Sequence, residues 1–233
     1  MSNILSAPWK NKQNTVLCAL LLILILHSLP NSLEAQTSDI VITKDDTFTD
    51  PRDNQNYRIR TFQRDDIGLG ISISQTWMID NLNYKIDNSW FFDNSKRKWG
   101  EYGRLYNWEA AQSACPTGWH LPSDIEWQRL LHILSTSRLV NLNLEAFSKS
   151  STLSGSEFEV QLGGILGFDG IFAEIGEQGG CWSATEFGRT KAYASIFGYS
   201  IGLPRSILHK EFGLSVRCIK NNNGADPPKA RPR

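Results

Sequence analysis

Four carboxylates that lie close together in the sequence are the first residues whose types could do chemistry. They are Asp169, Glu174, Glu177 and Glu186, in and just after a glycine-rich stretch. Two such groups could serve a glycosidase, and several could bind calcium together with nearby carbonyl oxygens. We favour ordinary solvated loop charge, so we predict no catalytic residue, no metal ligand and no cofactor. Calcium binding and acid–base hydrolysis remain the alternatives.

Histidine and cysteine offer a second kind of chemistry, which their spacing does not support. His120 precedes Leu121 and Pro122 in a turn, and no serine or cysteine in a recognisable nucleophile elbow accompanies it. We expect its ring to bond nearby backbone groups. No Cys/His spacing is typical of a zinc site. We expect Cys181 to be a buried spectator or part of an intermolecular bridge rather than a reactive thiol.

Aromatic residues are the third candidate group, since the chain has eight tryptophans in 233 residues. Residues 85–103 are polar and aromatic without a period, and we interpret them as a loop with exposed rings, which are Trp90, Phe91, Phe92 and Trp99. Because tryptophan favours recognition surfaces, Trp90 and Trp99 are candidate ligand-binding residues. Glu174 and Glu177, from the acidic group above, are the other two candidates. The formal net charge is zero, so the chain has no electrostatic reason to bind nucleic acid or an anionic membrane.

Two helices are predicted around these residues. Residues 105–114 read as a short helix with Trp108, Ala111 and Ala114 facing inward. Ser123 is typical of an N-cap, and Glu126 three residues later completes a capping box. In the second helix, the inward face is predicted from residues that recur at helical spacing, which are Trp127, Leu130, Leu131 and Leu134.

Alternating patterns predict the strands. Residues 57–60 alternate, and the clearest period-two face comprises Ile71, Ile73, Gln75, Trp77 and Ile79. A later strand is predicted from Tyr193, Ser195, Phe197, Tyr199 and Ile201. In the last strand we expect Leu214, Val216 and Cys218 to face inward and Ser215 and Arg217 to face outward. Residues 160–180 contain seven glycines, which favour tight turns and short strands, and residues 135–158 are predicted to be a surface loop.

The N-terminal segment is typical of an export signal. Lys10 and Lys12 precede an apolar run that ends before Pro30, and the predicted cleavage follows Ala35. The run is shorter than the roughly 20 residues needed to span a bilayer, although an uncleaved anchor is the alternative. We predict a signal peptide at 1–35, a leader at 36–45, one domain at 46–220 and a disordered tail at 221–233. The mature protein should have no membrane span and should lie in the periplasm, on the outer surface or outside the cell.

Several stretches carry a family resemblance, in an order that spans nearly the whole mature chain. They include Gln75-Thr76-Trp77-Met78, Tyr102-Gly103-Arg104-Leu105-Tyr106, Cys115-Pro116-Thr117-Gly118-Trp119-His120-Leu121-Pro122-Ser123, Trp182-Ser183-Ala184-Thr185-Glu186 and Val216-Arg217-Cys218. Together they resemble the Fibrobacter succinogenes major paralogous domain family. Two features depart from it: the chain is longer between Tyr57 and Gln75, and Cys181 stands where the family usually has an aromatic or another bulky residue.

The resemblance implies a disulfide between Cys115 and Cys218, with a bond from Cys181 to one of them as the alternative. Through His120-Leu121-Pro122-Ser123 and Glu126-Trp127 the family is in turn similar to the C-type-lectin-like and sulfatase-modifying-factor fold. That likeness implies an α+β fold, with two short helices packed on small antiparallel sheets, long loops and chain ends close together.

The function that we predict from these features is binding rather than catalysis. An exported module of the cell envelope, or a secreted one, would contact a glycan or protein ligand through loops on a disulfide-tied scaffold. The alternative is a structural or assembly protein of the envelope. A hydrolase that uses Asp169, Glu174, Glu177 and Glu186 is less favoured, and the sequence leaves the oligomeric state open.

Overall fold

The structure of the protein is a computed structural model that describes residues 40–43, 45–66, 71–135, 158–198 and 205–222. All of these residues belong to one unit, which begins at Ser38. The expected signal peptide, almost all of the expected loop at 135–158, and residues 223–233 of the expected tail lie outside the described residues. Part of the expected leader is a strand, β1, which pairs with β3.

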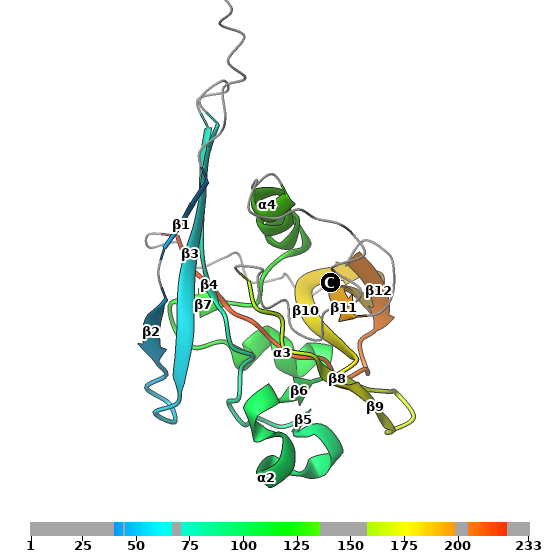
Figure 1. The fold of residues 1–233 in the computed structure, drawn as a ribbon. Coiled ribbons are helices and arrows are strands. Elements are labelled where there is room, and N and C mark those ends of the chain that lie inside the picture. The colour runs from blue at the N-terminus through cyan, green and yellow to red at the C-terminus, as the bar shows by residue number, and fades with distance from the viewer. Residues whose placement is uncertain (1–39, 44, 67–70, 136–157, 199–204, 223–233) are drawn as a thin grey trace, which may run out of the picture. The chain divides into compact units, whose positions relative to one another are not determined.

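Strands from both ends of the described chain meet in one sheet (Figure 1). Within the described residues its order is β1-β3-β4-β13-β7, with β2 also pairing to β3, and every pairing is antiparallel. The strands are β1 (Ile40–Ile42), β2 (Asp46–Thr49), β3 (Asn56–Asp66), β4 (Ile71–Met78), β7 (Trp119–His120) and β13 (Ile219–Lys220). The alternation predicted for β4 is confirmed, because Gln75 and Trp77 are buried whereas Ser72 and Ser74 are exposed.

A second sheet is formed by the glycine-rich part of the chain and the strands after it. Its order in the described residues is β12-β11-β10-β8-β9, antiparallel except where β10 meets β8. The strands are β8 (Gly163–Leu166), β9 (Phe172–Ile175), β10 (Gln178–Phe187), β11 (Lys191–Gly198) and β12 (Arg205–His209). The predicted strand through Tyr193, Ser195 and Phe197 is confirmed, while Tyr199 and Ile201 lie outside the described residues.

The first predicted helix is present but starts later than expected. It is α3 (Trp108–Ala114), because residues 105 and 106 form β6 (Leu105–Tyr106), which pairs with β5 (Ser89–Trp90). Asn107 caps α3, and its Oδ1 accepts a hydrogen bond from the Ala110 amide at 2.9 Å. The predicted inward residues of α3 are all buried.

The second helix, α4 (Asp124–Ser135), is confirmed together with its capping box. The Ser123 amide donates to Glu126 Oε2 at 2.8 Å, and the Glu126 amide donates to Ser123 Oγ at 3.3 Å. Its buried face contains Ile133, which the spacing argument left out, whereas Leu131 is only half-buried. The helical spacing therefore predicted which side of α4 is buried, but it did not predict every residue on that side.

Two large aromatic clusters fill the core. One gathers around Trp182, Tyr106 and Trp108, and the other around Trp77 and Trp127. The indole Nε1 of Trp182 donates to the Tyr106 carbonyl at 2.8 Å, so burial does not leave that polar group unpaired. Each fully buried ring of this size contributes about 2–3 kcal/mol by burial of apolar surface.

Residues 214–218, which precede β13, contradict the prediction that Ser215 and Arg217 face outward. Leu214, Val216 and Cys218 are buried as expected, but Ser215 and Arg217 are 1% and 0% exposed rather than outward-facing. The physical reason is that this segment has neighbours on both sides: its backbone bonds to residues 78 and 82 on one side and bridges to β10 on the other.

Arg217 compensates for its burial by using three nitrogens. Nε donates to Asn81 Oδ1 at 3.0 Å, Nη1 to the Phe158 carbonyl at 2.8 Å, and Nη2 to the Glu159 carbonyl at 2.7 Å. Burial still lowers the pKa of Arg217 to about 10. Arg217 thereby holds residues 158–159 against the core.

A disulfide joins Cys115 to Cys218 across 103 residue positions, as the family resemblance implied, and Cys181 carries a free, buried thiol. Such bonds are typical of proteins that fold outside the reducing cytoplasm. In the described part of the chain, no helix has the length and apolar character needed to cross a membrane. Two antiparallel sheets with α3 and α4 place the protein in the α+β class, with more strand than helix.

Candidate functional site

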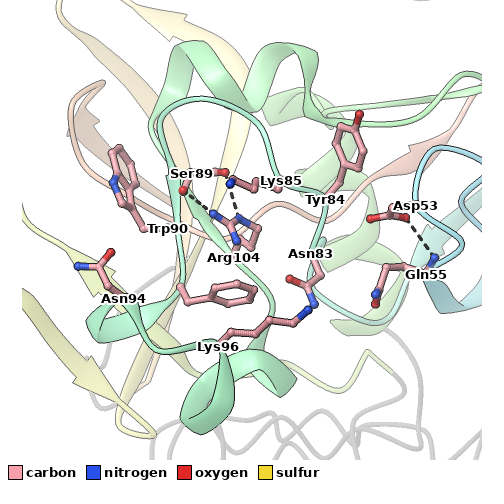
Figure 2. Close-up of a pocket in the computed structure, with 11 residues that line it drawn as sticks. Asp53, Gln55, Asn83, Tyr84, Lys85, Ser89, Trp90, Asn94, Lys96 and Arg104 are labelled. Carbon is pink, nitrogen blue, oxygen red and sulfur yellow. Dashed lines mark hydrogen bonds between the residues drawn. The ribbon is translucent and has the colours of Figure 1, made fainter.

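A pocket of about 630 Å³ lies between the turn that joins β2 to β3 and the segment from Asn83 to Arg104 (Figure 2). Its basic and aromatic lining residues are Lys85, Lys96, Arg104, Tyr84, Trp90 and Phe91. The remaining lining residues are Asp53, Gln55, Asn83, Ser89 and Asn94. Its volume falls within the range of small-molecule sites, about 300–1,000 Å³.

The segment around the pocket is more ordered than the loop that we predicted for residues 85–103. It contains β5, two short 3-10 turns, η1 (Phe92–Asn94) and η2 (Gly100–Tyr102), and α2 (Lys96–Trp99). The expectation of exposed rings is wrong for Trp90, Phe91 and Phe92, which are half-buried or buried. Phe92 packs with Leu105 and Leu166 in a third apolar cluster, and Trp90 packs against that cluster. The side chain of Trp99 lies outside the described part of the structure.

The pairing of β5 with β6 positions the centre of the pocket. It places Ser89 opposite Tyr106, and Arg104 directly precedes β6. The preceding Gly103 has φ of 76°, and a Cβ there would come within 2.8 Å of Asn81, so glycine is required for this close approach. The Arg104 amide donates to the Leu82 carbonyl at 3.0 Å, which fixes the backbone of the arginine.

Arg104 is the most buried charged group of the pocket, with 6% of its surface exposed. Its Nε donates to Ser89 Oγ at 3.0 Å and its Nη2 to the Ser89 carbonyl at 2.6 Å (Figure 2). Its guanidinium carbon lies 4.3 Å from the centroid of the Phe91 ring. Burial lowers the pKa of Arg104, because the charged form loses hydration.

Tyr84 also lines the pocket, and separate contacts fix its backbone and its ring. The hydroxyl of the buried Tyr106 donates to the Tyr84 carbonyl at 2.6 Å. The Arg52 guanidinium carbon lies 3.7 Å from the centroid of the Tyr84 ring, and Arg52 is itself paired with Asp50 at 2.7 Å. Burial alone would raise the pKa of Asp50, but its hydrogen bonds with Arg52 hold that pKa below the ordinary value.

The four acidic residues singled out in the sequence are spread over three places. Glu174, near the end of β9, and Glu177, in the turn to β10, are exposed, and the Glu177 amide donates to the Glu174 carbonyl at 3.0 Å. Asp169 lies in the turn at the other end of β9 and accepts the Ile171 amide at 3.1 Å. Glu186 pairs with Lys210 at 2.9 Å. Among the described residues, no group of three or more His, Cys, Asp or Glu is arranged to hold a metal ion.

His120 bonds two side chains, where we expected backbone partners. Nε2 lies 2.9 Å from Glu126 Oε1, and Nδ1 lies 2.6 Å from Asn221 Oδ1. Burial would lower the pKa of His120, but these bonds raise it; burial would raise the pKa of Glu126, but His120 and Ser123 lower it. The ring therefore ties the start of α4 to Asn221, the first residue of the expected tail.

Cys181 is fully buried, and burial raises the pKa of its thiol to about 11. A thiol in that state is a poor nucleophile.

The pocket residues that sequence reasoning missed are Lys85, Lys96, Arg104 and Tyr84. A signal for them exists, since basic residues alternate with aromatic ones between positions 84 and 104. Our sequence-based prediction for this stretch uses only its rings. The convergence of the three cations depends on the β5–β6 pairing and on the short helix α2.

Comparison with known proteins gives one match. Residues 54–220, well over half of the chain, match the family model described as the Fibrobacter succinogenes major domain. No curated protein and no solved structure matches the chain. The family resemblance inferred from the sequence motifs is thus confirmed.

Proposed function

The chain belongs to the Fibrobacter succinogenes major domain family, and from this membership and the pocket beside β5 we propose that it is an exported, non-enzymatic binding module of the cell envelope that takes a glycan ligand. The observation that carries the proposal is the composition of that pocket. Its lining includes the aromatic residues Tyr84 and Trp90, and the side-chain amides of Gln55 and Asn94 offer hydrogen bonds. Small-ligand sites combine aromatic walls with a few fixed polar groups in this way.

Rigidity of the site supports binding. The pocket lies on short elements whose backbones are fixed by the packed core, through Tyr106 beneath Tyr84 and through the β5–β6 pair beneath Arg104. A preformed site loses little conformational entropy when its ligand binds.

Export is supported by two independent features. Residues 1–35 have the charge and hydrophobicity pattern of a signal peptide, and the Cys115–Cys218 bond is typical of oxidising compartments. The finer fold assignment, C-type-lectin-like, is part of the proposal. The arrangement of α3 and α4 with two antiparallel sheets supports it, as does the presence of the first and last described strands in one sheet. Superposition of a crystal structure of the protein on C-type lectin domains tests it.

The binding test uses the full chain, expressed with its own N-terminal segment and purified from an oxidising compartment. The folded protein is titrated with envelope and plant polysaccharides, in calcium and in chelator. We expect saturable binding that Trp90→Ala weakens at least about tenfold. The control is Phe168→Ala, because Phe168 is a 69% exposed ring outside the pocket and its loss should not change binding.

The outcomes separate the candidate functions. Binding to no glycan by a protein with a native circular dichroism spectrum overturns the proposal and favours an envelope protein with a structural or assembly role. Binding that Trp90→Ala does not weaken removes the pocket from the proposal. Calcium-dependent binding that Glu174→Gln/Glu177→Gln abolishes places the ligand at the β9–β10 turn instead.

A further inference from the structure

Among the described residues, Arg104 differs from Arg217, the other buried arginine, in one respect. Arg217 uses Nε, Nη1 and Nη2 for hydrogen bonds to three acceptors. Arg104 uses Nε and Nη2, both toward Ser89, and within the described residues Nη1 has no hydrogen-bond partner. Nη1 is also not among the fully buried polar atoms that lack a partner. It therefore keeps accessible surface, and Arg104 lines the pocket.

The two bonds to Ser89 occupy one edge of the guanidinium plane, the edge formed by Nε and Nη2. The adjacent edge, formed by Nη1 and the second N–H of Nη2, remains for another acceptor. Two parallel N–H donors on a planar group match the two oxygens of a carboxylate. In the described part of the chain no carboxylate pairs with Arg104, although Arg52, Arg58 and Arg205 each have one.

Two of the three other charged residues that line the pocket are cations, like Arg104. Lys85 and Lys96 are exposed, line the pocket, and form no ion pair in the part of the chain that the structure describes. The acidic lining residue, Asp53, accepts the Gln55 amide at 3.1 Å. A cleft lined mainly by cations raises the local concentration of anions, and here it does so on a chain whose formal net charge is zero.

We infer that the pocket binds an acidic sugar residue, with its carboxylate on the free edge of Arg104 and its ring against Trp90 or Tyr84. The inference rests on the proposed function and adds the chemical class of the ligand to it. Lys85 and Lys96 strengthen the attraction, and the side-chain amides of Gln55 and Asn94, both exposed lining residues, are available to the hydroxyl groups. A peptide carboxylate would use Arg104 equally well, but the amides and rings favour a polyhydroxylated partner.

The test compares ligands that differ only in charge. Oligosaccharides of galacturonate, of glucuronate and of mannuronate are titrated into the full-length protein by calorimetry, each beside its methyl ester. The same titration uses dextran sulfate, a neutral cello-oligosaccharide and a short acidic peptide with a free C-terminus. We expect one uronate to bind at least about tenfold more tightly than its own methyl ester, and its affinity to fall as salt concentration rises.

The variants identify the groups responsible. Lys85→Ala/Lys96→Ala changes two exposed side chains and should weaken uronate binding about three- to tenfold. Arg97→Ala is the matched control, since it removes a cation from α2 that does not line the pocket. Arg104→Met should abolish the preference for the acid over the ester, and circular dichroism establishes whether this variant folds. If it does not fold, the ester comparison and the lysine variants still decide the question.

Each outcome has one meaning. Equal binding of a uronate and its ester, or binding of the neutral glycan alone, overturns the acidic-sugar inference and leaves the glycan-binding function standing. Preference for the peptide or for dextran sulfate also overturns it, in favour of a peptide carboxylate or a sulfated ligand. Binding of no saccharide removes both the inference and the proposed function.

Discussion

The Cys115–Cys218 bond allows a quantitative test of how the domain is held together. The bond ties the end of α3 to the residue before β13 and closes a loop of 103 residue positions. For a loop of about 100 residues, the loss of chain entropy in the unfolded state corresponds to about 4.7 kcal/mol at room temperature. This value lies near the upper end of the losses measured on removing native disulfides, which are about 2–5 kcal/mol.

The perturbation is the double substitution Cys115→Ala/Cys218→Ala, followed by urea unfolding detected by tryptophan fluorescence. Trp77 and Trp182 are fully buried, so their emission reports loss of the core. With a urea slope of about 2 kcal/mol per molar, an expected loss of about 2–5 kcal/mol corresponds to a fall in the midpoint of about 1–2.5 M. The slope should also rise, because the unfolded chain without the bond exposes more surface.

A reducing agent supplies the matched control. It should lower the midpoint of the wild type and of Cys181→Ala, which keeps the bond, and should leave the double variant unchanged. A double variant whose midpoint lies within about 0.3 M of the oxidised wild type would refute the reasoning. Loop closure would then contribute little to the free energy of unfolding, and the packing around Trp77 and Trp182 would account for the stability of the domain.

Three further outcomes follow from the contacts described above. His120 should contribute fully to the free energy of unfolding below its unfolded pKa near 6.5, and this contribution should be lost as pH rises through its higher folded pKa. Glu126 should contribute fully above its unfolded pKa of 4.5, and this contribution should be lost as pH falls through its lower folded pKa. Urea midpoints from pH 3 to pH 9 should therefore be highest at mildly acidic pH, and Glu126→Gln should flatten the profile; an unchanged profile counts against the pair. Arg217→Met leaves three buried acceptors without donors and should lower the unfolding free energy by about 3–5 kcal/mol; a loss below about 1 kcal/mol in thermal unfolding contradicts its structural role. Gly164→Ala places a Cβ within 2.5 Å of Phe92 at a φ of 74°, whereas Gly118→Ala has similar backbone strain and no atom within 4 Å. Gly164→Ala should therefore lower the free energy of unfolding by about 1–3 kcal/mol more than Gly118→Ala. Equal losses in the two variants argue against the close contact.

The elements that could be predicted from the sequence are those determined by near neighbours. The capping box at Ser123 and Glu126 needs only two residues three positions apart, and the alternation of β4 needs only one covered face. Both are present in the structure. The start of α3 was misplaced because residues 105–106 gain more from pairing with β5 than from extending the helix.

The candidate site could be predicted only in part, because the burial of a charged side chain depends on contacts with residues that are distant in the sequence. Alternation placed Arg217 outward, yet a segment covered on both sides leaves no outward face. Likewise, nothing local distinguishes Arg104 from an exposed arginine until β5 brings Ser89 against it. Trp90 was identified as a ligand candidate by residue type, and the charges beside it were not.

The position of β13 has a consequence for the order of events during biosynthesis. In the first sheet this strand lies between β4 and β7, although it is made last of the three. The strand that connects β4 and β7 is therefore made after both of them, and Cys218 likewise follows its partner Cys115 by 103 positions. Contacts so distant in sequence make folding slow. A product that stops before residue 219 lacks the strand that unites this sheet and stays a substrate for chaperones and proteases.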